Sequence, residues 1–218
     1  MGIERLPDGR IRVTPPLSDH DVRELHAGDQ VLIEGTVIGA RDAAHKRMVE
    51  MLDLGEELPF DPAGAVIYYV GPTPERPGRV VGAAGPTTAS RMDAYTPRLL
   101  DLGVKAVIGK GGRGQAVREA LVATTAVAMA ALGGGGALAA RAIRAQRVIA
   151  FDDLGPEAVR QIEMDDFPAW VVNDCEGRDF YAEAIRPWRN DQALPAELRT
   201  DQATDRAIHE RGALGGGL

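Results

Sequence analysis

The apolar residues of this chain fall into short runs, which glycine, proline and polar residues separate. Valine, isoleucine and tyrosine are frequent in these runs, as is typical of strands buried in a sheet. The runs predict strands at residues 10–13, 30–40, 65–70, 79–83, 104–108, 121–129, 147–151, 169–173 and 179–184. Gly35 and Gly39 within the second run indicate a bulge or a close approach of another part of the chain.

Helical patterns lie between several of these strands. The clearest amphipathic helix is predicted over residues 41–54, with Gly55 as its C-terminal cap. Shorter helices are predicted over residues 18–26, 96–103 and 137–146, and from Gly155 onward. Because strands and helices alternate, we expect an α/β fold with a mixed sheet flanked by helices over residues 1–186. Residues 187–218 are polar and end in glycines, which is typical of a disordered or partner-contacting tail.

A glycine-rich loop, Gly109-Lys-Gly-Gly-Arg-Gly114, follows one predicted strand and matches the G-x-G-x-x-G spacing of dinucleotide-binding folds. That fingerprint requires an acidic residue about twenty positions further on, to bind the ribose. The sequence has no such residue between Glu119 and Asp152. A Walker loop is also excluded, because neither serine nor threonine follows Lys110. The loop is therefore interpreted as presenting backbone amides and Lys110 to an anion, with a nucleotide-binding module and a simple structural turn as the alternatives.

Composition and charge narrow the classes of function. The net charge of −7 argues against nucleic acid as a partner. One cysteine, Cys175, excludes an internal disulfide and cannot hold a metal cluster by itself. The four histidines lack metal-ligand spacing, so we expect no metal ligands in this chain. The N-terminal residues lack the apolar segment of a signal peptide, and the apolar run 120–132 is too short to span a membrane. These features predict a cytoplasmic protein that does not bind membranes.

The stretch from Gly82 to Asp93 carries a distinctive combination of side chains. Thr87 and Thr88 are adjacent hydroxyl groups, and Arg91 follows them within one turn. An arginine side chain is always charged and fits a carboxylate with two parallel hydrogen bonds. Arg41 stands where a predicted strand gives way to a helix, which is a second position suited to an anion. The alternative is that these residues are helix caps and solvated charges.

Four stretches in order resemble the β part of the class I, iron–sulfur fumarate hydratases and the related L-tartrate dehydratases. They are residues 40–47 (ARDAAHKR), 85–93 (GPTTASRMD), 107–112 (VIGKGG) and 166–170 (DFPAW). The resemblance extends from about Pro16 to about Tyr181. It implies a swivelling β/β/α-type domain.

The activity that the resemblance implies is the reversible hydration of fumarate to malate, or the dehydration of tartrate to oxaloacetate. A substrate with two carboxylates needs cations at both ends, and the resemblance places Arg41, Arg91 and Lys110 in the site. Thr87 and Thr88 would lie beside the substrate. Thr87 is the first candidate for proton transfer, activated by Lys110 or by a partner group, and Asp42 is the second.

The family's cofactor is a 4Fe–4S cluster with one open iron, whose cysteine ligands lie in the α part. This chain has only Cys175. It therefore looks like the β half alone, and we expect a separate α subunit to bring the cluster. The complex would be a heterotetramer, or would contain a homo-oligomer of the β chain. A non-enzymatic subunit that only stabilises its partner remains an alternative from another class.

Overall fold

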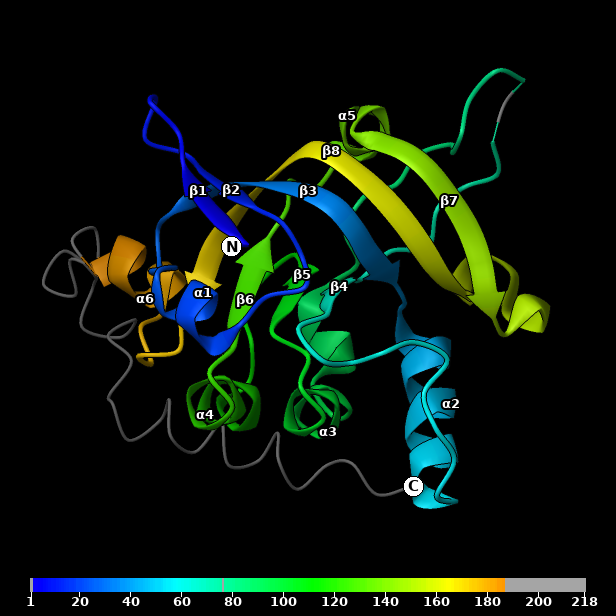
Figure 1. Ribbon diagram of the computed structural model, residues 1–218, viewed down its shortest axis with the longest axis horizontal. Coiled ribbons are helices and arrows are strands. Elements are labelled where there is room, and N and C mark those ends of the chain that lie inside the picture. The colour runs from blue at the N-terminus through cyan, green and yellow to red at the C-terminus, as the bar shows by residue number, and fades with distance from the viewer. Residues whose placement is uncertain (1, 76, 187–218) are drawn as a thin grey trace, which may run out of the picture. The chain divides into compact units, whose positions relative to one another are not determined.

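The fold is described from a computed structural model, which describes residues 2–75 and 77–186 (Figure 1). Eight strands form one sheet in the order β1-β2-β3-β4-β5-β6-β8-β7. Their bounds are Ile3–Arg5, Ile11–Val13, Gln30–Gly39, Val66–Tyr68, Ala106–Gly109, Val127–Ala130, Ile143–Ala150 for β7 and Val159–Asn173 for β8. Parallel and antiparallel pairs both occur in the sheet, so the predicted mixed α/β fold is confirmed.

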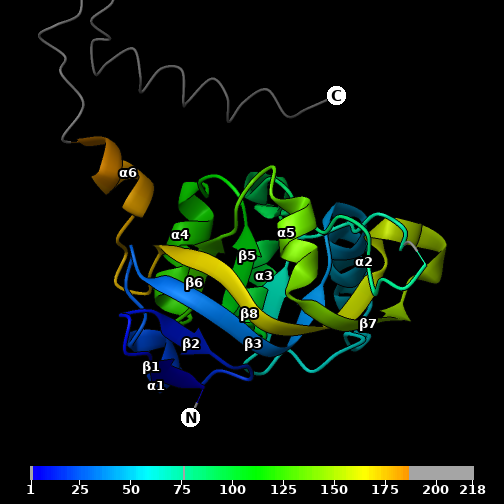
Figure 2. The same cartoon turned by 90° about the horizontal axis from the view of Figure 1, so that it is seen from above.

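Two long strands, β3 and β8, close part of this sheet into a ring. They pair antiparallel along almost their whole length, from Gln30 opposite Trp170 to Gly39 opposite Arg160. The other edge of β3 pairs with β2 and then with β4, and the other edge of β8 pairs with β7 and with β6. The pairings β3–β4–β5–β6–β8 therefore return to β3. Figures 1 and 2 show β3 and β8 side by side as one arch over the shorter strands.

The short central strands are buried on both faces, and each face contributes to a separate core. In β4, Val66 and Tyr68 belong to the core enclosed by the ring, whereas Ile67 points into the core under the helices. This alternation follows from the two-residue period of a strand. The second core receives the buried faces of three helices through Met48, Leu99 and Leu121, which explains why these strands read as continuous apolar runs.

The helices are mostly short. The α-helices are α1 Asp19–Arg23, α2 Asp42–Asp53, α3 Thr96–Asp101, α4 Gln115–Ala123, α5 Gly136–Arg141 and α6 Phe180–Ile185, and the 3-10 helices are η1 Ala89–Met92 and η2 Asp152–Glu157. The predicted start of α1 is confirmed, because Ser18 and Asp21 form a reciprocal capping box. The predicted amphipathic helix is α2, and the predicted bulge in β3 lies between Ile33 and Gly35.

Five short predictions of secondary structure were wrong in whole or in part. One is the helix predicted over residues 137–146, of which residues 143–146 belong to β7. Residues 79–83 form no strand, since this stretch folds back on Thr73 through backbone hydrogen bonds. The predicted strand 121–129 is correct only for residues 127–129, which lie in β6. Residues 121–123 end α4, and the Thr124 hydroxyl after them donates to the carbonyl of Ala120. Residues 180–185 are helical rather than extended. The helix predicted from Gly155 onward is not formed, because the 3-10 helix η2 begins earlier, at Asp152, and ends at Glu157. Each segment is too short for its apolar pattern to distinguish helix from strand.

The parallel strands end in register at one edge of the sheet. Gly39 pairs with Tyr68, Tyr68 with Ile108, and Ile108 with Met129. The residues that follow these four strands are therefore brought to the same edge, which is where open α/β sheets place their ligand sites.

A compact unit covers residues 1–181, and a second unit begins at residue 182. The proposed tail, residues 187–218, lies outside the described residues. Within the described part of the chain, none of the helices has the length and apolar character needed to cross a bilayer.

Gly64, just before β4, provides a test of this packing. Its φ is +75°, and a Cβ there would lie 2.8 Å from the backbone N and O atoms of Leu17. We expect Gly64→Ala to lower the free energy of unfolding by at least about 3 kcal/mol, because left-handed strain adds to a clash with rigid backbone. Gly9→Ala is the matched control: its φ is +88° with no atom within 4 Å, so it should lose only about 1–2 kcal/mol. Urea unfolding that gave equal losses would contradict this account.

Candidate functional site

Four charged side chains at the shared edge form a continuous series of ion pairs, the charge chain: Glu157, Arg41, Asp42 and Arg91. Nη2 of Arg41 lies 3.3 Å from Oε1 of Glu157, and its Nε donates to Oδ2 of Asp42 at 3.1 Å. The other oxygen of Asp42, Oδ1, lies 2.6 Å from Nε of Arg91. One carboxylate thus contacts two guanidinium groups. These come from two separate sequence motifs, residues 40–47 and residues 85–93.

Arg41 occupies the junction between β3 and α2. It is the N-cap of α2 but makes no capping hydrogen bond with its own side chain. Instead, Oε2 of Glu157 accepts a hydrogen bond from the backbone N–H of Ala43 at 2.9 Å. The Arg41 side chain lies over Gly71, where a Cβ would stand 2.8 Å from Cδ of Arg41 and 2.9 Å from its Nη1. Only glycine at position 71 leaves room for this placement.

Asp42 is held as an anion by its neighbours. Burial acts to raise its pKa, but hydrogen bonds from its own backbone and from Arg41, together with the charge of Arg91, hold the pKa below its ordinary value. The balance follows from the two guanidinium groups that favour the charged form. Asp42 is therefore ionised at neutral pH and acts here first as an anchor for two arginines.

Thr87, Thr88 and Lys110 come together at the same edge of the sheet, where Thr88 directly precedes η1, the 3-10 helix that carries Arg91. The Thr87 backbone donates to the carbonyl of Tyr69 at 2.7 Å and accepts from the backbone N–H of Lys110 at 3.1 Å. Thr88 and Lys110 form a parallel β-bridge. The short segment that carries the threonines is therefore inserted between the ends of β4 and β5. Thr87 is buried, Thr88 is exposed, and Nζ of Lys110 donates to the carbonyl of Pro86 at 2.8 Å.

The glycine loop after β5 is held by a buried arginine, Arg113, which the sequence analysis did not identify as a functional residue. Arg113 is 5% exposed and donates to Asp93 at 2.8 Å, to Tyr69 Oη at 3.1 Å and to Thr96 Oγ1 at 2.7 Å. The backbone N–H of Gly114, at the start of α4, donates to the other oxygen of Asp93 at 2.7 Å. A dinucleotide would place its pyrophosphate at that helix start. Because Asp93 already occupies the position, the loop is poorly suited to bind one.

His45 lies in α2, and its ring contacts the backbone of Arg41. It is fully buried, and its Nδ1 lies 3.0 Å from the carbonyl oxygen of Arg41. Its ring stands edge-on to Tyr69, with centroids 5.2 Å apart. Burial lowers the pKa of His45 from 6.5 to about 4, although the hydrogen bond to the Arg41 carbonyl acts in the opposite direction. The imidazole is therefore neutral at neutral pH, and Nδ1 donates to that carbonyl.

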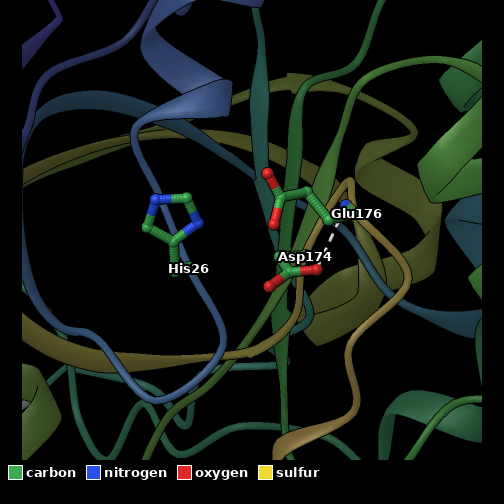
Figure 3. Close-up of side chains that lie close together, drawn as sticks. All are labelled: His26, Asp174 and Glu176. Carbon is green, nitrogen blue, oxygen red and sulfur yellow. Dashed lines mark hydrogen bonds between the residues drawn. The ribbon is translucent and has the colours of Figure 1, made fainter.

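Another group of side chains with metal-binding atoms lies away from the charge chain: His26, Asp174 and Glu176 (Figure 3). Their ligand atoms lie within 4.8 Å of one another. Asp174 also accepts hydrogen bonds from the backbone N–H groups of Ala27, Glu176 and Arg178. Its carboxylate thus has a structural role, joining two turns of the chain.

Cys175 lies in the same turn, which follows Asn173 at the end of β8. Asn173 pairs with Ala128 near the start of β6, whereas the charge chain lies beyond the ends of the parallel strands. Burial raises the pKa of the Cys175 thiol, and the nearby Asp174 charge acts in the same direction. A thiol that is hard to ionise and lies at the opposite edge of the sheet does not fit a cluster ligand at this site.

The buried His45 makes the stability of the chain depend on pH. Since its folded pKa of about 4 is below the ordinary 6.5, the unfolded state binds more protons between these values, and stability falls as pH falls. We expect about 2 kcal/mol less stability at pH 5 than at pH 7 from this residue alone. In urea unfolding at both pH values, His45→Gln should remove this difference and His20→Gln, an exposed control, should keep it. Equal pH dependence in all three proteins would refute the assignment.

Comparison with known proteins finds relatives named as fumarate hydratases and as a tartrate dehydratase subunit. The family model described as the fumarase C-terminus matches residues 5–184. Fumarate hydratase 2 of Leishmania major is 39% identical over 160 residues, covering 72% of this chain and 28% of that protein. The anaerobic class I fumarate hydratase of Escherichia coli is 37% identical over 155 residues, covering 70% and 28%. A Methanocaldococcus jannaschii protein, provisionally named L(+)-tartrate dehydratase subunit beta, is 36% identical over 173 residues, covering 77% and 89%.

The chain therefore spans less than a third of the two fumarate hydratases and nearly all of the subunit. The matched region contains every residue of the charge chain and both threonines. With the family model covering most of its length, this protein belongs to the fumarase C-terminus family.

Proposed function

We propose that this chain is the β part of a two-part 4Fe–4S hydro-lyase that reversibly adds water to fumarate, forming malate. The observation that carries the proposal is the charge chain, with Lys110 at the same edge of the sheet, in a family whose relatives are named fumarate hydratases. Arg41, Arg91 and Lys110 supply three cations at one edge of the sheet. A dicarboxylate substrate needs cations of this kind at both ends.

The cations would also favour the reaction itself. In dehydration a proton leaves the carbon beside a carboxylate, and in hydration a proton joins that carbon. In both directions the species that lacks this proton carries extra negative charge on the carboxylate oxygens. Guanidinium and ammonium groups stabilise this charge more in the transition state than in the ground state. Asp42 sets the orientation of both arginines, so the site is organised before substrate binds.

Thr87 is our candidate for moving the proton. The backbone hydrogen bonds on both sides of Thr87 fix its position, and Lys110 is its immediate neighbour in the sheet. A threonine hydroxyl is a weak base, so activation by Lys110 or by a partner residue is part of the proposal. Thr88, which is exposed, would contact the substrate from the open side. Asp42 is the second candidate, although its two arginine contacts make it a poor proton acceptor.

The cluster would have to come from a partner. Cys175 is the only cysteine of the chain and does not fit a ligand at the charge chain. The name of the M. jannaschii relative, a subunit beta, supports a separate partner chain. The two fumarate hydratases are more than three times as long as the region they share with this protein. We therefore propose a cluster-bearing α subunit as the partner, in a heterotetramer or with a β homo-oligomer, in the reducing cytoplasm.

The second candidate substrate is L-tartrate, dehydrated to oxaloacetate. The similarity to the M. jannaschii subunit over most of both chains favours it. Tartrate and malate both carry two carboxylates and a hydroxyl group, so the same cations would serve both. A dinucleotide-binding module is less consistent with the structure, because Asp93 occupies the start of α4.

Arg91 is the cation whose replacement is easiest to interpret. Arg91→Lys keeps the charge but loses the bidentate geometry, so kcat/KM of the complex should fall by an amount equivalent to roughly 1.5–3 kcal/mol. Arg98→Lys changes an exposed arginine of α3 and should leave kcat/KM unchanged. Steady-state kinetics with fumarate and tartrate measure both variants. Near-normal turnover of Arg91→Lys would remove Arg91 from the site.

Dependence on a partner can be tested directly. The purified chain should fold, bind no iron and convert neither fumarate nor tartrate, since its residues do not form a cluster site. Addition of an anaerobically reconstituted α chain should restore turnover, and exposure to air should abolish it again. The α chain alone is the control. Turnover by this chain alone in the presence of a chelator would overturn both the mechanism and the two-chain proposal.

A further inference from the structure

We infer that Glu157 is a positioning residue that fixes the Arg41 guanidinium group and the start of α2 with a single carboxylate. The inference rests on the proposed function and assigns a role to a residue outside the predicted site. Glu157 is the last residue of η2. It lies 114 residues along the sequence from Ala43, whose backbone N–H at the start of α2 it accepts a hydrogen bond from.

The two oxygens of this carboxylate have different tasks. Oε1 lies 3.3 Å from Nη2 of Arg41, and Oε2 accepts from the N–H of Ala43 at 2.9 Å. A helix start carries unpaired N–H groups and partial positive charge, so a carboxylate there is favoured. By binding both groups at once, Glu157 fixes the distance between the arginine head group and the helix. The side chain is 27% exposed, so solvent screens this ion pair only in part.

The second anchor of Arg41 cannot replace the first. Asp42 contacts Nε of Arg41, but its other oxygen is engaged with Arg91. Without Glu157, the guanidinium group would be held at Nε alone and could rotate away from Gly71. A misplaced cation then binds a substrate carboxylate less well even though its charge is unchanged. Glu157 thus acts through Arg41 and need not touch the substrate.

The same segment offers a matched control. Asp153, also in η2, forms a double hydrogen bond to Arg47 of α2 at 2.7 and 2.8 Å. The Arg47 guanidinium group lies 4.9 Å from the centroid of the Phe151 ring. Asp153 therefore joins η2 to α2 as Glu157 does, but through an arginine outside the charge chain. A purely structural role for Glu157 predicts that loss of either carboxylate has similar consequences.

The test uses the complex of the full chain with its cluster-bearing partner. Glu157→Gln keeps an oxygen for the Ala43 N–H and removes the charge, and Asp153→Asn is the control. Calorimetry with succinate, a dicarboxylate that cannot be hydrated, should show at least about tenfold weaker binding for E157Q and less than about twofold change for D153N. With fumarate, KM should rise more than kcat falls in E157Q. Both variants should unfold within about 4 °C of each other.

A double-mutant cycle shows whether the effect passes through Arg41. In an Arg41→Ala background, Glu157→Gln should change the succinate Kd by less than about twofold. Three outcomes would overturn the inference. Glu157→Gln could weaken succinate binding equally in the Arg41→Ala background, E157Q could show the same Kd as D153N, or E157Q could bind succinate more tightly.

Should E157Q fail to assemble with its partner, Glu157→Asp is the second variant. It retains the charge with a shorter reach and should weaken succinate binding in the same direction. If the unaltered complex binds succinate but converts neither fumarate nor tartrate, the proposed function fails while the role of Glu157 is still measured.

Discussion

The antiparallel pairing of β3 with β8 is the constraint on which the rest of the structure depends. Because both strands are long, the second edge of each pairs with two further strands: β2 and β4 pair with β3, and β6 and β7 pair with β8. The short strands β4, β5 and β6 are therefore held between β3 and β8, in register and buried on both faces. That register places the residues that follow each strand at one edge, where all the predicted site residues are found.

The edge itself is stabilised by alternating charges. Arginines 41 and 91 would repel each other if left unpaired, and Asp42 between them lowers that cost. Glu157 supplies the second carboxylate and at the same time caps α2. Beneath them, the neutral His45 contributes a hydrogen bond without adding another positive charge to a site already rich in cations.

Buried polar contacts also determine which loops are rigid. Arg113, Asp93, Thr96 and the Tyr69 hydroxyl form one connected network under the glycine loop. Since a buried arginine without partners is very costly, this network holds the loop in one conformation. The loop that resembles a nucleotide-binding motif is thus held by side chains of the protein itself, and Lys110 is presented from a fixed backbone.

The sequence by itself determined the elements whose signal is local. The apolar runs of β3, β4 and β5, the amphipathic face of α2 and the cap at Ser18 follow from strand and helix periods and from capping chemistry, and the structure has them. The run of threonines and arginine after Gly85, with Arg41 and Lys110, also identified the family. Only the tertiary structure decided that Glu157 reaches Arg41 and that Arg113 is buried on Asp93. These outcomes depend on contacts between segments far apart in the chain, and such contacts leave no periodic pattern in the residues around them.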